Sequence, residues 1–341
     1  MSATERVAAT AGRTDGAGDD VILRSRGVCK HFPVRSFFGT SKQVVRAVDG
    51  IDLDIRRGET FGLVGESGCG KSTLGRTLIR MYEPTAGTIE FDGHDITRAR
   101  GRALVDIHRR MQIVFQDPYL SLDPHQTVRE IVSEPMRVGT SMSADEIDDR
   151  VAEMLDRVSL HHDDMYKFAY EFSGGQRQRV GIARALSVKP DFILCDEPIS
   201  ALDVSIQAQV VNMLEDLQQE LHLTYLFVAH DLSMVRHISS RIGVMYLGRI
   251  VELADADELY DNPLHPYTRA LLSAIPVPDP HADMIARRQT LKGELPSPLH
   301  VPSGCRFHTR CPLATPACAQ AEPALREVSP GHFVACDVVG A

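Results

Sequence analysis

Short apolar runs alternate with helical stretches between residues 21 and about 250. The runs are rich in branched and aromatic side chains, which is typical of buried strands. They predict strands at 44–48, 51–55, 60–65, 192–195 and 225–229. Residues 72–81 and 206–221 have helical composition, and the first of these stretches ends before a Glu-Pro pair. This alternation predicts an α/β fold with a largely parallel sheet.

A further helix is predicted from its first residues. Ser143 is a suitable N-cap, and Glu146 three residues later completes a capping box. The apolar residues that follow fall on one helical stripe: Ile147, Val151, Met154, Leu155 and Val158. The stripe indicates a helix with one buried face.

The chain divides into three regions by composition. Residues 1–20 are small, polar and glycine-rich, which predicts a disordered tail. Residues 21–250 carry the α/β pattern. From 251 to 341 prolines become frequent and four of the seven cysteines gather near the end, which predicts a separate, loop-rich accessory region.

Composition and charge narrow the class of protein. Of the 341 residues, 43% are hydrophobic and 24% are charged, as in ordinary soluble domains. The balance of 37 Lys and Arg against 46 Asp and Glu gives a net charge of −9, which argues against a protein that holds nucleic acid on a broad basic face. No apolar run reaches the roughly 18–20 residues that span a bilayer, and no secretory signal is evident. These features predict a cytosolic protein whose cysteines are thiols or metal ligands.

A glycine-rich loop follows the predicted strand at 60–65. It fits the pattern G-x-x-x-x-G-K-[ST] in full with Gly65, Glu66, Ser67, Gly68, Cys69, Gly70, Lys71, Ser72 and Thr73. Glycines let consecutive backbone N–H groups point at phosphate oxygens, and the next helix adds the positive end of its dipole. Lys71 would reach the β- and γ-phosphates of ATP, while the Ser72 hydroxyl would bind Mg²⁺. The alternative is a glycine turn without a ligand, which leaves the strand–loop–helix context unexplained.

Two carboxylates end the predicted strand at 192–195. Asp196 at the strand tip would hold Mg²⁺, and Glu197 would polarise the attacking water. Strands often end in acidic residues at solvent, so this pattern alone is weak. Downstream of a phosphate-binding loop it indicates an ATPase.

Three further segments make the interpretation specific. Ser173, Gly174, Gly175 and Gln176 open a helical stretch, Gln116 lies in a Phe-Gln-Asp-Pro segment, and His230 follows the predicted strand at 225–229. With Asp203 beyond Glu197, this order closely resembles the ATP-binding cassette (ABC) family over about residues 21–250. The resemblance implies a P-loop NTPase of the ABC type, with a RecA-like core and a helical subdomain that carries residues 173–176.

The resemblance also implies roles for these residues. Residues 173–176 are expected to bind the γ-phosphate of ATP held by an opposite cassette, so that the active unit is a head-to-tail pair. Gln116 and His230 would act with Glu197 in catalysis, Gln116 would also contact Mg²⁺, and Asp203 would lie at the dimer seam. Phe32 matches the aromatic residue that stacks on adenine, with a core position at a strand end as the alternative.

Several segments are more similar to one branch of this family. Residues 46–50, 115–124, 262–268, 272–276 and 305–312 resemble the ATPases of oligopeptide/dipeptide importers. Residues 37–42 and 273–278 resemble the F-type subunit more than the D-type subunit. The resemblance implies an ATP-hydrolysing subunit that energises peptide import.

The same resemblance implies partners and a location. The expected partners are a paralogous ATPase subunit, two membrane permease subunits and an extracytoplasmic substrate-binding protein, with no nucleic acid. The chain is expected to be peripheral at the cytoplasmic face of the cell membrane. One alternative is the same role for nickel or another small solute, and another is a soluble ABC ATPase acting on nucleic acid or ribosomes.

The remaining cysteines and histidines leave alternatives open. Cys305, Cys311, Cys318 and Cys336 suit a [4Fe–4S] cluster, whereas structural zinc usually uses closer pairs; zinc and free thiols remain the alternatives. Cys69 is either a reactive thiol at a helix N-terminus or a buried one. Residues 161–164 read His-His-Asp-Asp, which is either a metal site or, as we expect, a solvated loop.

Overall fold

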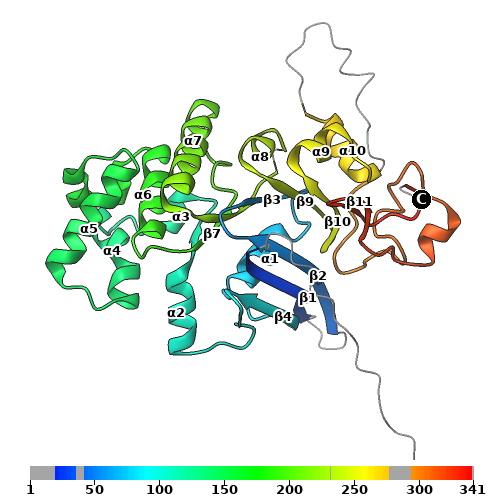
Figure 1. Ribbon diagram of the computed structural model, residues 1–341, viewed down its shortest axis with the longest axis horizontal. Helices are drawn as coiled ribbons and strands as arrows, with labels where there is room; N and C mark the ends of the chain where they lie inside the picture. Colours follow the sequence, from blue (N-terminus) through cyan, green and yellow to red (C-terminus); the bar gives the residue numbers. More distant parts are fainter. Residues whose placement is uncertain (1–19, 36–41, 231, 276–292, 340–341) are drawn as a thin grey trace, which may run out of the picture.

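The computed structural model describes residues 20–35, 42–230, 232–275 and 293–339. The tail predicted at 1–20 and the F-type segments at 37–42 and 273–278 therefore lie largely outside the described residues. Within them, the chain forms two sheets with helices around them (Figure 1). The predicted α/β fold is confirmed.

The smaller sheet is antiparallel and has the strand order β2-β1-β4-β5. Its strands are β1 (Val21–Arg35), β2 (Lys42–Arg56), β4 (Ala86–Phe91) and β5 (His94–Asp95). Strand β2 joins the two strands predicted at 44–48 and 51–55 into one. Gly50 between them adopts a positive φ of 77°, and the pairing with β1 continues past it with register shifts, so the break in the apolar pattern is a bulge.

The larger sheet has the strand order β11-β12-β10-β9-β3-β8-β7-β6. Its parallel strands are β3 (Thr60–Val64), β6 (Met111–Val114), β7 (Phe192–Asp196), β8 (Thr224–Val228) and β9 (Arg241–Tyr246). Strands β3, β7 and β8 are buried along their whole length, which explains their continuous apolar runs. Because they are parallel, their carboxyl ends meet at one edge of the sheet.

Helix α1 (Lys71–Leu78) contacts strands of both sheets. Its buried residues Leu74 and Leu78 share a core with β1, β2, β3 and β7. The packing of α1 therefore fixes the position of the glycine-rich loop that precedes it between the two sheets.

A group of helices occupies one end of the molecule in Figure 1. Helix α5 begins after Ser143 with the predicted capping box to Glu146, and its predicted stripe is buried. The helices of this end are α2 (Arg102–Arg110), α3 (Pro118–Ser121), α4 (Val128–Gly139), α5 (Ala144–Arg157), α6 (Gly174–Leu186), η1 (His162–Tyr166) and η2 (Ala169–Glu171). Helix α7 (Val204–Leu221) runs from this end toward the larger sheet, and α8 (Leu232–Ile238) packs on β3.

The region after residue 250 lies at the opposite end of the molecule (Figure 1). Its antiparallel strands continue the larger sheet, because β12 (His332–Val334) pairs with β10 (Arg249–Asp255) and with β11 (Arg326–Ser329). Its helices are α9 (Ala256–Asp261), α10 (Pro266–Ser273) and η3 (Pro316–Ala319).

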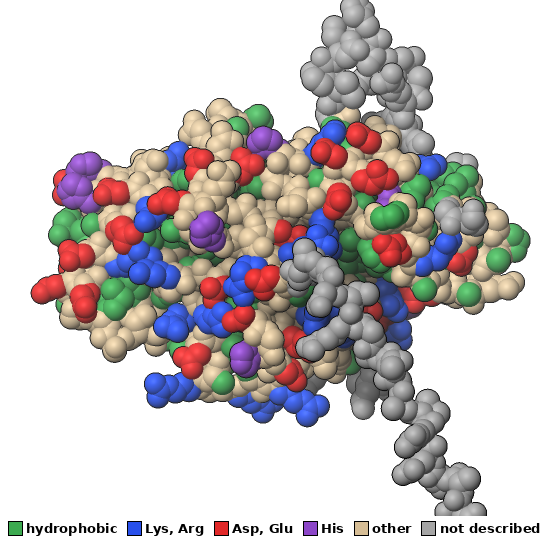
Figure 2. Space-filling view, in the orientation of Figure 1, with side chains coloured by type: hydrophobic (Ala, Val, Ile, Leu, Met, Phe, Trp, Pro, Cys, Tyr) green, Lys and Arg blue, Asp and Glu red, His purple; other side chains and the backbone are tan. Residues whose placement is uncertain are grey.

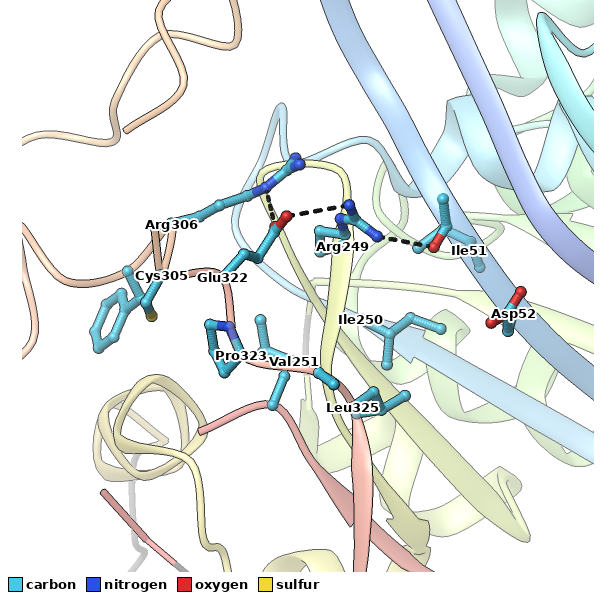
Figure 3. Close-up of a pocket in the computed structure, with 14 residues that line it drawn as sticks. Ile51, Asp52, Arg249, Ile250, Val251, Cys305, Arg306, Glu322, Pro323 and Leu325 are labelled. Atoms are coloured by element: carbon cyan, nitrogen blue, oxygen red, sulfur yellow. Dashed lines mark hydrogen bonds and ion pairs between the residues drawn. The ribbon is translucent and has the colours of Figure 1, made fainter. Parts of the chain in front are cut away.

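Charged side chains tie this region to the rest of the chain. Figure 3 shows Glu322 between Arg306 and Arg249, with Glu322 accepting hydrogen bonds at 2.8 Å and 3.1 Å. Arg306 also donates to the Asp49 carboxylate of β2 at 2.5 Å. The cavity beside these residues has a volume of about 380 Å³ and extends to Cys305.

Candidate functional site

The predicted site residues come from the ends of parallel strands. The glycine-rich loop follows β3, Gln116 lies two residues beyond β6, Glu197 follows β7, and His230 lies two residues beyond β8. A cavity of about 470 Å³ opens at this edge. The predicted residues that line it are Phe32, Ser67, Gly68, Gly70, Lys71, Ser72, Thr73, Gln116 and Glu197.

The shape of the loop depends on its glycines. Gly65 and Gly70 have positive φ angles of 151° and 112°. A Cβ atom on Gly70 would collide with the carbonyl oxygen of Ala47, and one on Gly65 with that of Met245. Only glycine lets the loop pass this close to neighbouring backbone.

Lys71 is folded back onto its own loop. Its side chain is buried, and its Nζ atom donates hydrogen bonds to the carbonyl oxygens of Gly65 at 2.8 Å and Glu66 at 3.2 Å. The loop carbonyls thus hold a buried cation beside the cavity. That cation can pair with an anionic ligand by exchanging those carbonyls for the ligand's oxygens.

Asp196 has one occupied and one unpartnered oxygen. The residue is fully buried, and its Oδ2 atom accepts a hydrogen bond from Nε of Arg76 at 3.0 Å and lies 2.9 Å from Nη2 of the same guanidinium. Its Oδ1 atom is buried and has no hydrogen-bond partner among the described residues. Since a buried carboxylate oxygen is costly to leave unpaired, this atom fits the ligand shell of a cation such as Mg²⁺.

Gln116 and His230 converge on the carboxylate of Glu197. The Nε2 atom of Gln116 donates to Oε2 of Glu197 at 2.7 Å, and Nδ1 of His230 lies 3.8 Å from the same oxygen. Glu197 has a φ of 49°, a conformation that is unusual outside glycine and often found at functional sites. This arrangement can orient a water molecule and accept its proton.

Phe32 lies at the rim of the same cavity. Its ring packs edge-on against Tyr82 with 5.7 Å between centroids, and Lys30 Nζ lies 5.0 Å from its ring centre. The side chain is half-buried rather than part of the core. It can therefore offer a ring face to a planar ligand.

Residues 173–176 lie away from this cavity. Ser173 is the N-cap of α6 and forms a capping box with Gln176, and both side chains are exposed. A Cβ on Gly175 would come within 2.7 Å of Ile206, so glycine keeps α6 close to α7. Asp203 stands at the N-cap position of α7, where its side chain makes no capping hydrogen bond, and it is also exposed. Among the described residues that line the cavity, none belongs to these two segments.

The structure separates the alternatives for Cys69. The side chain is 1% exposed, and burial raises the pKa of the thiol despite the nearby Lys71. The reactive thiol was the wrong alternative, because packing against the core outweighs the effect of the helix N-terminus.

Two other groups of metal-binding side chains come together in the described chain. His161, His162 and Asp163 are exposed around the start of η1, in keeping with the expected solvated position. Cys29, His31 and Asp49 also lie together, but Asp49 is already paired with Arg306. Although burial opposes it, this hydrogen bond lowers the pKa of Asp49.

Sequence reasoning missed two residues that hold the loop from the region after residue 250. The hydroxyl of Tyr267 accepts a hydrogen bond from the backbone N–H of Glu66 at 2.8 Å. Arg310 donates to both carboxylate oxygens of Glu66 at 2.7 Å and 3.0 Å. Both residues lie in segments that resemble the importer ATPases, 262–268 and 305–312, but nothing in those segments points to Glu66 as their partner.

Comparisons with known proteins agree with this geometry. A family model described as ABC transporter matches residues 48–200, and one described as oligopeptide/dipeptide transporter, C-terminal region, matches residues 251–318. The chain is 53% identical over 322 residues to the oligopeptide transport ATP-binding protein AppF of Bacillus subtilis, covering 94% of this chain and 98% of that protein. It is 48% identical over 320 residues to the oligopeptide transport ATP-binding protein OppF of Salmonella typhimurium, covering 93% and 96%.

A solved structure is similar as well. It is a dimeric structure of a post-hydrolysis state of the ATP-binding cassette MJ0796 bound to ADP and Pi. The TM-score is 0.62 at 29% sequence identity, and the match covers 69% of this chain and 98% of that one.

Proposed function

Since this chain belongs to the ABC transporter ATPases that carry the oligopeptide/dipeptide C-terminal region, we propose that it hydrolyses ATP to energise peptide import. The observation that carries the proposal is one cavity lined by Lys71, Ser72, Gln116 and Glu197, with the C-terminal region of a peptide transporter packed on the same chain.

ATP is bound by the glycine-rich loop in this proposal. Lys71 exchanges its loop carbonyls for the β- and γ-phosphate oxygens, and the backbone N–H groups of the loop donate to the phosphates. Phe32 stacks on the adenine. Asp196, Ser72 and the side-chain oxygen of Gln116 would hold Mg²⁺, and the unpartnered Oδ1 of Asp196 supports this assignment. When bound, Mg²⁺ neutralises charge on the phosphates.

Glu197 acts on the attacking water. Its carboxylate accepts a hydrogen bond from the water and takes up its proton as the oxygen attacks the γ-phosphorus. The bond from that phosphorus to the ADP oxygen breaks, giving ADP and phosphate. Gln116 fixes the Glu197 side chain through the 2.7 Å hydrogen bond, and His230 contacts the γ-phosphate.

A second cassette completes each site. Ser173, Gly174, Gly175 and Gln176 are accessible at the start of α6 but do not line the cavity of their own chain, which supports a role against ATP held by another subunit. Asp203 lies at the seam of this head-to-tail pair. We assign the second cassette to a paralogous ATPase, which makes the pair a heterodimer.

Membrane permease subunits are the partners that peptide import requires. Along the described part of the chain, no helix is long and apolar enough to cross a bilayer. We propose that the chain binds two permease subunits at the cytoplasmic face of the membrane, and that an extracytoplasmic binding protein delivers the peptide. Figure 2 shows acidic and basic side chains interspersed on the face it displays, which gives no support to nucleic acid as the partner.

Reconstitution tests the function. Proteoliposomes are prepared with this chain, the second ATPase and both permeases, with the ATPases facing outward. ATP added outside should be hydrolysed faster when peptide-loaded binding protein is enclosed inside the vesicles. Nickel-loaded binding protein, or DNA and ribosomes added to the soluble chain, should give no stimulation. The Lys71→Ala variant serves as the inactive control. Stimulation by nickel or by nucleic acid alone would contradict peptide import.

A [4Fe–4S] cluster is our proposal for the four cysteines of the C-terminal region. Burial, followed by the charges of Cys336, Cys318 and Cys311, raises the pKa of Cys305 to about 11, so all four thiols share one neighbourhood. No three of them lie within 4.8 Å of one another among the described residues, whereas thiolates around one zinc ion would be about 3.8 Å apart. The spacing of the four cysteines along the chain, which lacks the close pairs of structural zinc sites, supports the cluster over zinc.

Metal analysis tests this cofactor. Protein purified without oxygen should contain about four iron atoms per chain and absorb broadly near 400 nm. Cys311→Ser should lose both signals, and Cys195→Ala, which changes a cysteine of β7 that lies four strands from β10 in the larger sheet, should keep them. Stoichiometric zinc, or no metal, would contradict the proposal.

A further inference from the structure

The segment 305–312 carries two arginines that the roles above do not use. Arg306 binds the Asp49 carboxylate, the Leu247 carbonyl and Glu322, and so fastens the segment to β2 and the β9–β10 turn. Arg310, four residues later, reaches the glycine-rich loop instead. Its guanidinium forms a two-point pair with the Glu66 carboxylate, and its side chain is only 7% exposed. Two-point pairing of this kind fixes orientation as well as distance.

Glu66 is held at its backbone from the same side. The N–H group of Glu66 donates to the hydroxyl of Tyr267, whose ring is buried against Tyr246 and Phe307 at centroid distances of 4.7 Å and 5.4 Å. The guanidinium of Arg310 lies 6.0 Å from the ring centre of Tyr246. Both contacts to Glu66 therefore come from residues of the C-terminal region that pack together around Tyr246 of β9.

The charge of Glu66 matters because of where it lies. Between Gly65 and Thr73 the loop has two charged side chains, Glu66 and Lys71, and Lys71 Nζ is 3.2 Å from the carbonyl oxygen of Glu66. An unpaired carboxylate there would cancel the lysine and repel an anionic ligand. Paired with Arg310, the loop keeps a net positive charge toward phosphates.

We propose that Arg310 is a positioning residue for ATP: by neutralising and orienting Glu66, it lets the C-terminal region set the affinity of the loop for nucleotide. This inference rests on the proposed assignment of residues 65–73 as the phosphate site. The inference adds Arg310, which lies outside the cassette, to the residues that determine the affinity for nucleotide. Because the pair is bidentate and nearly buried, lysine at 310 should replace the charge but not the geometry.

A charge-deletion cycle on the full chain tests the proposal, with the fluorescent analogue MANT-ATP and Mg²⁺ as the probe. Arg310→Met should raise the Kd about tenfold, since it leaves an unpaired carboxylate on the loop that binds the phosphates. Glu66→Gln should bind no more weakly than the wild type, because it removes the repulsive charge. The double variant should return to within about threefold of the wild type, and Arg310→Lys should lie between the wild type and Arg310→Met.

Arg129→Met is the matched control. It removes an arginine from an ion pair with Asp148 in the helical end of the molecule, so its Kd should stay within about twofold of the wild type. Raising the salt concentration should shrink the effect of Arg310→Met, which a purely structural defect would not do. Thermal unfolding of each variant separates misfolding from weakened binding.

Several results would overturn the inference. One is a Kd for Arg310→Met equal to that of the wild type; another is a double variant as weak as Arg310→Met alone. If Arg310→Met does not fold, Glu66→Gln remains decisive, and binding more than about threefold weaker than the wild type refutes neutralisation. Lys71→Ala separates the two levels: if it binds normally, the proposed phosphate site is wrong, whereas if only the Arg310 variants bind normally, only this inference fails.

Discussion

Replacing Glu197 with glutamine is the sharpest test of the catalytic assignment. The substitution keeps the size of the side chain and one oxygen that can accept the 2.7 Å hydrogen bond from Gln116. It removes the negative charge that would polarise water and take up a proton. The left-handed backbone at this position should be unaffected, because glutamate and glutamine are both unbranched at Cβ and so experience the same steric strain there.

The expected loss follows from the chemistry of a general base. Removing one costs on the order of 10²–10⁴ in rate. At about 1.36 kcal/mol per factor of ten, this raises the barrier by roughly 2.7–5.4 kcal/mol. Nucleotide affinity should hardly change, since Lys71 and Ser72 remain in place on the other wall of the cavity. The variant should therefore accumulate with ATP bound.

Phosphate release from the assembled transporter, at saturating Mg²⁺ and ATP, measures the loss of turnover. Size-exclusion chromatography with ATP measures the accumulation of the ATP-bound form, because the closed pair of cassettes should elute as a dimer. Glu220→Gln is the control, as it changes an exposed glutamate paired with Arg157. Turnover of Glu197→Gln within about threefold of the wild type would refute the assignment.

Three further predictions concern the loop and the sheet. Lys71→Ala should lose binding of Mg²⁺-ATP by more than about tenfold in equilibrium titrations, because the buried cation of the loop is gone, and normal affinity would contradict it. Cys69 should resist maleimide in the native protein and react only after unfolding, as mass spectrometry of labelled peptides would show; rapid native labelling would mean that the loop opens. The hydrogen bond to Glu252 raises the pKa of buried His332, so its stabilising charge is fully present below about pH 6.5 and is lost as the pH rises through the raised pKa. The stability difference between wild type and His332→Gln in urea should thus shrink as the pH rises from 6 to 9, and a constant difference would contradict the pairing.

Features set by neighbours in the chain were predictable from sequence. The capping box of Ser143 and Glu146 fixes the start of α5 within a few residues, and the glycine-rich pattern marks a loop between a strand and a helix. The parallel strands also bring Asp196 to the same end of the sheet as the loop, where Arg76 of the helix after the loop donates to it. Each of these features depends on residues that are neighbours in sequence or on the regular geometry of a parallel sheet, so the sequence pattern alone predicts it.

Features set by distant segments were not predictable. The break at Gly50 looks like the end of a strand, but pairing with β1 carries β2 through it. Cys69 has the sequence context of an activated thiol, and only packing of the two sheets decides that it is buried. Arg310 and Glu66 are 244 positions apart, and no local pattern reports such a pair.

One edge of strand β10 remains unpaired while the rest of the chain is being synthesised. Glu252 pairs with Val334, so the partner strand emerges about 80 residues after β10. At a synthesis rate of ~5–20 residues per second, β12 is made on the order of 4–16 s after β10. An exposed strand edge readily pairs with other chains, so nascent chains that end between 260 and 330 should be the ones most prone to aggregate and most dependent on chaperones.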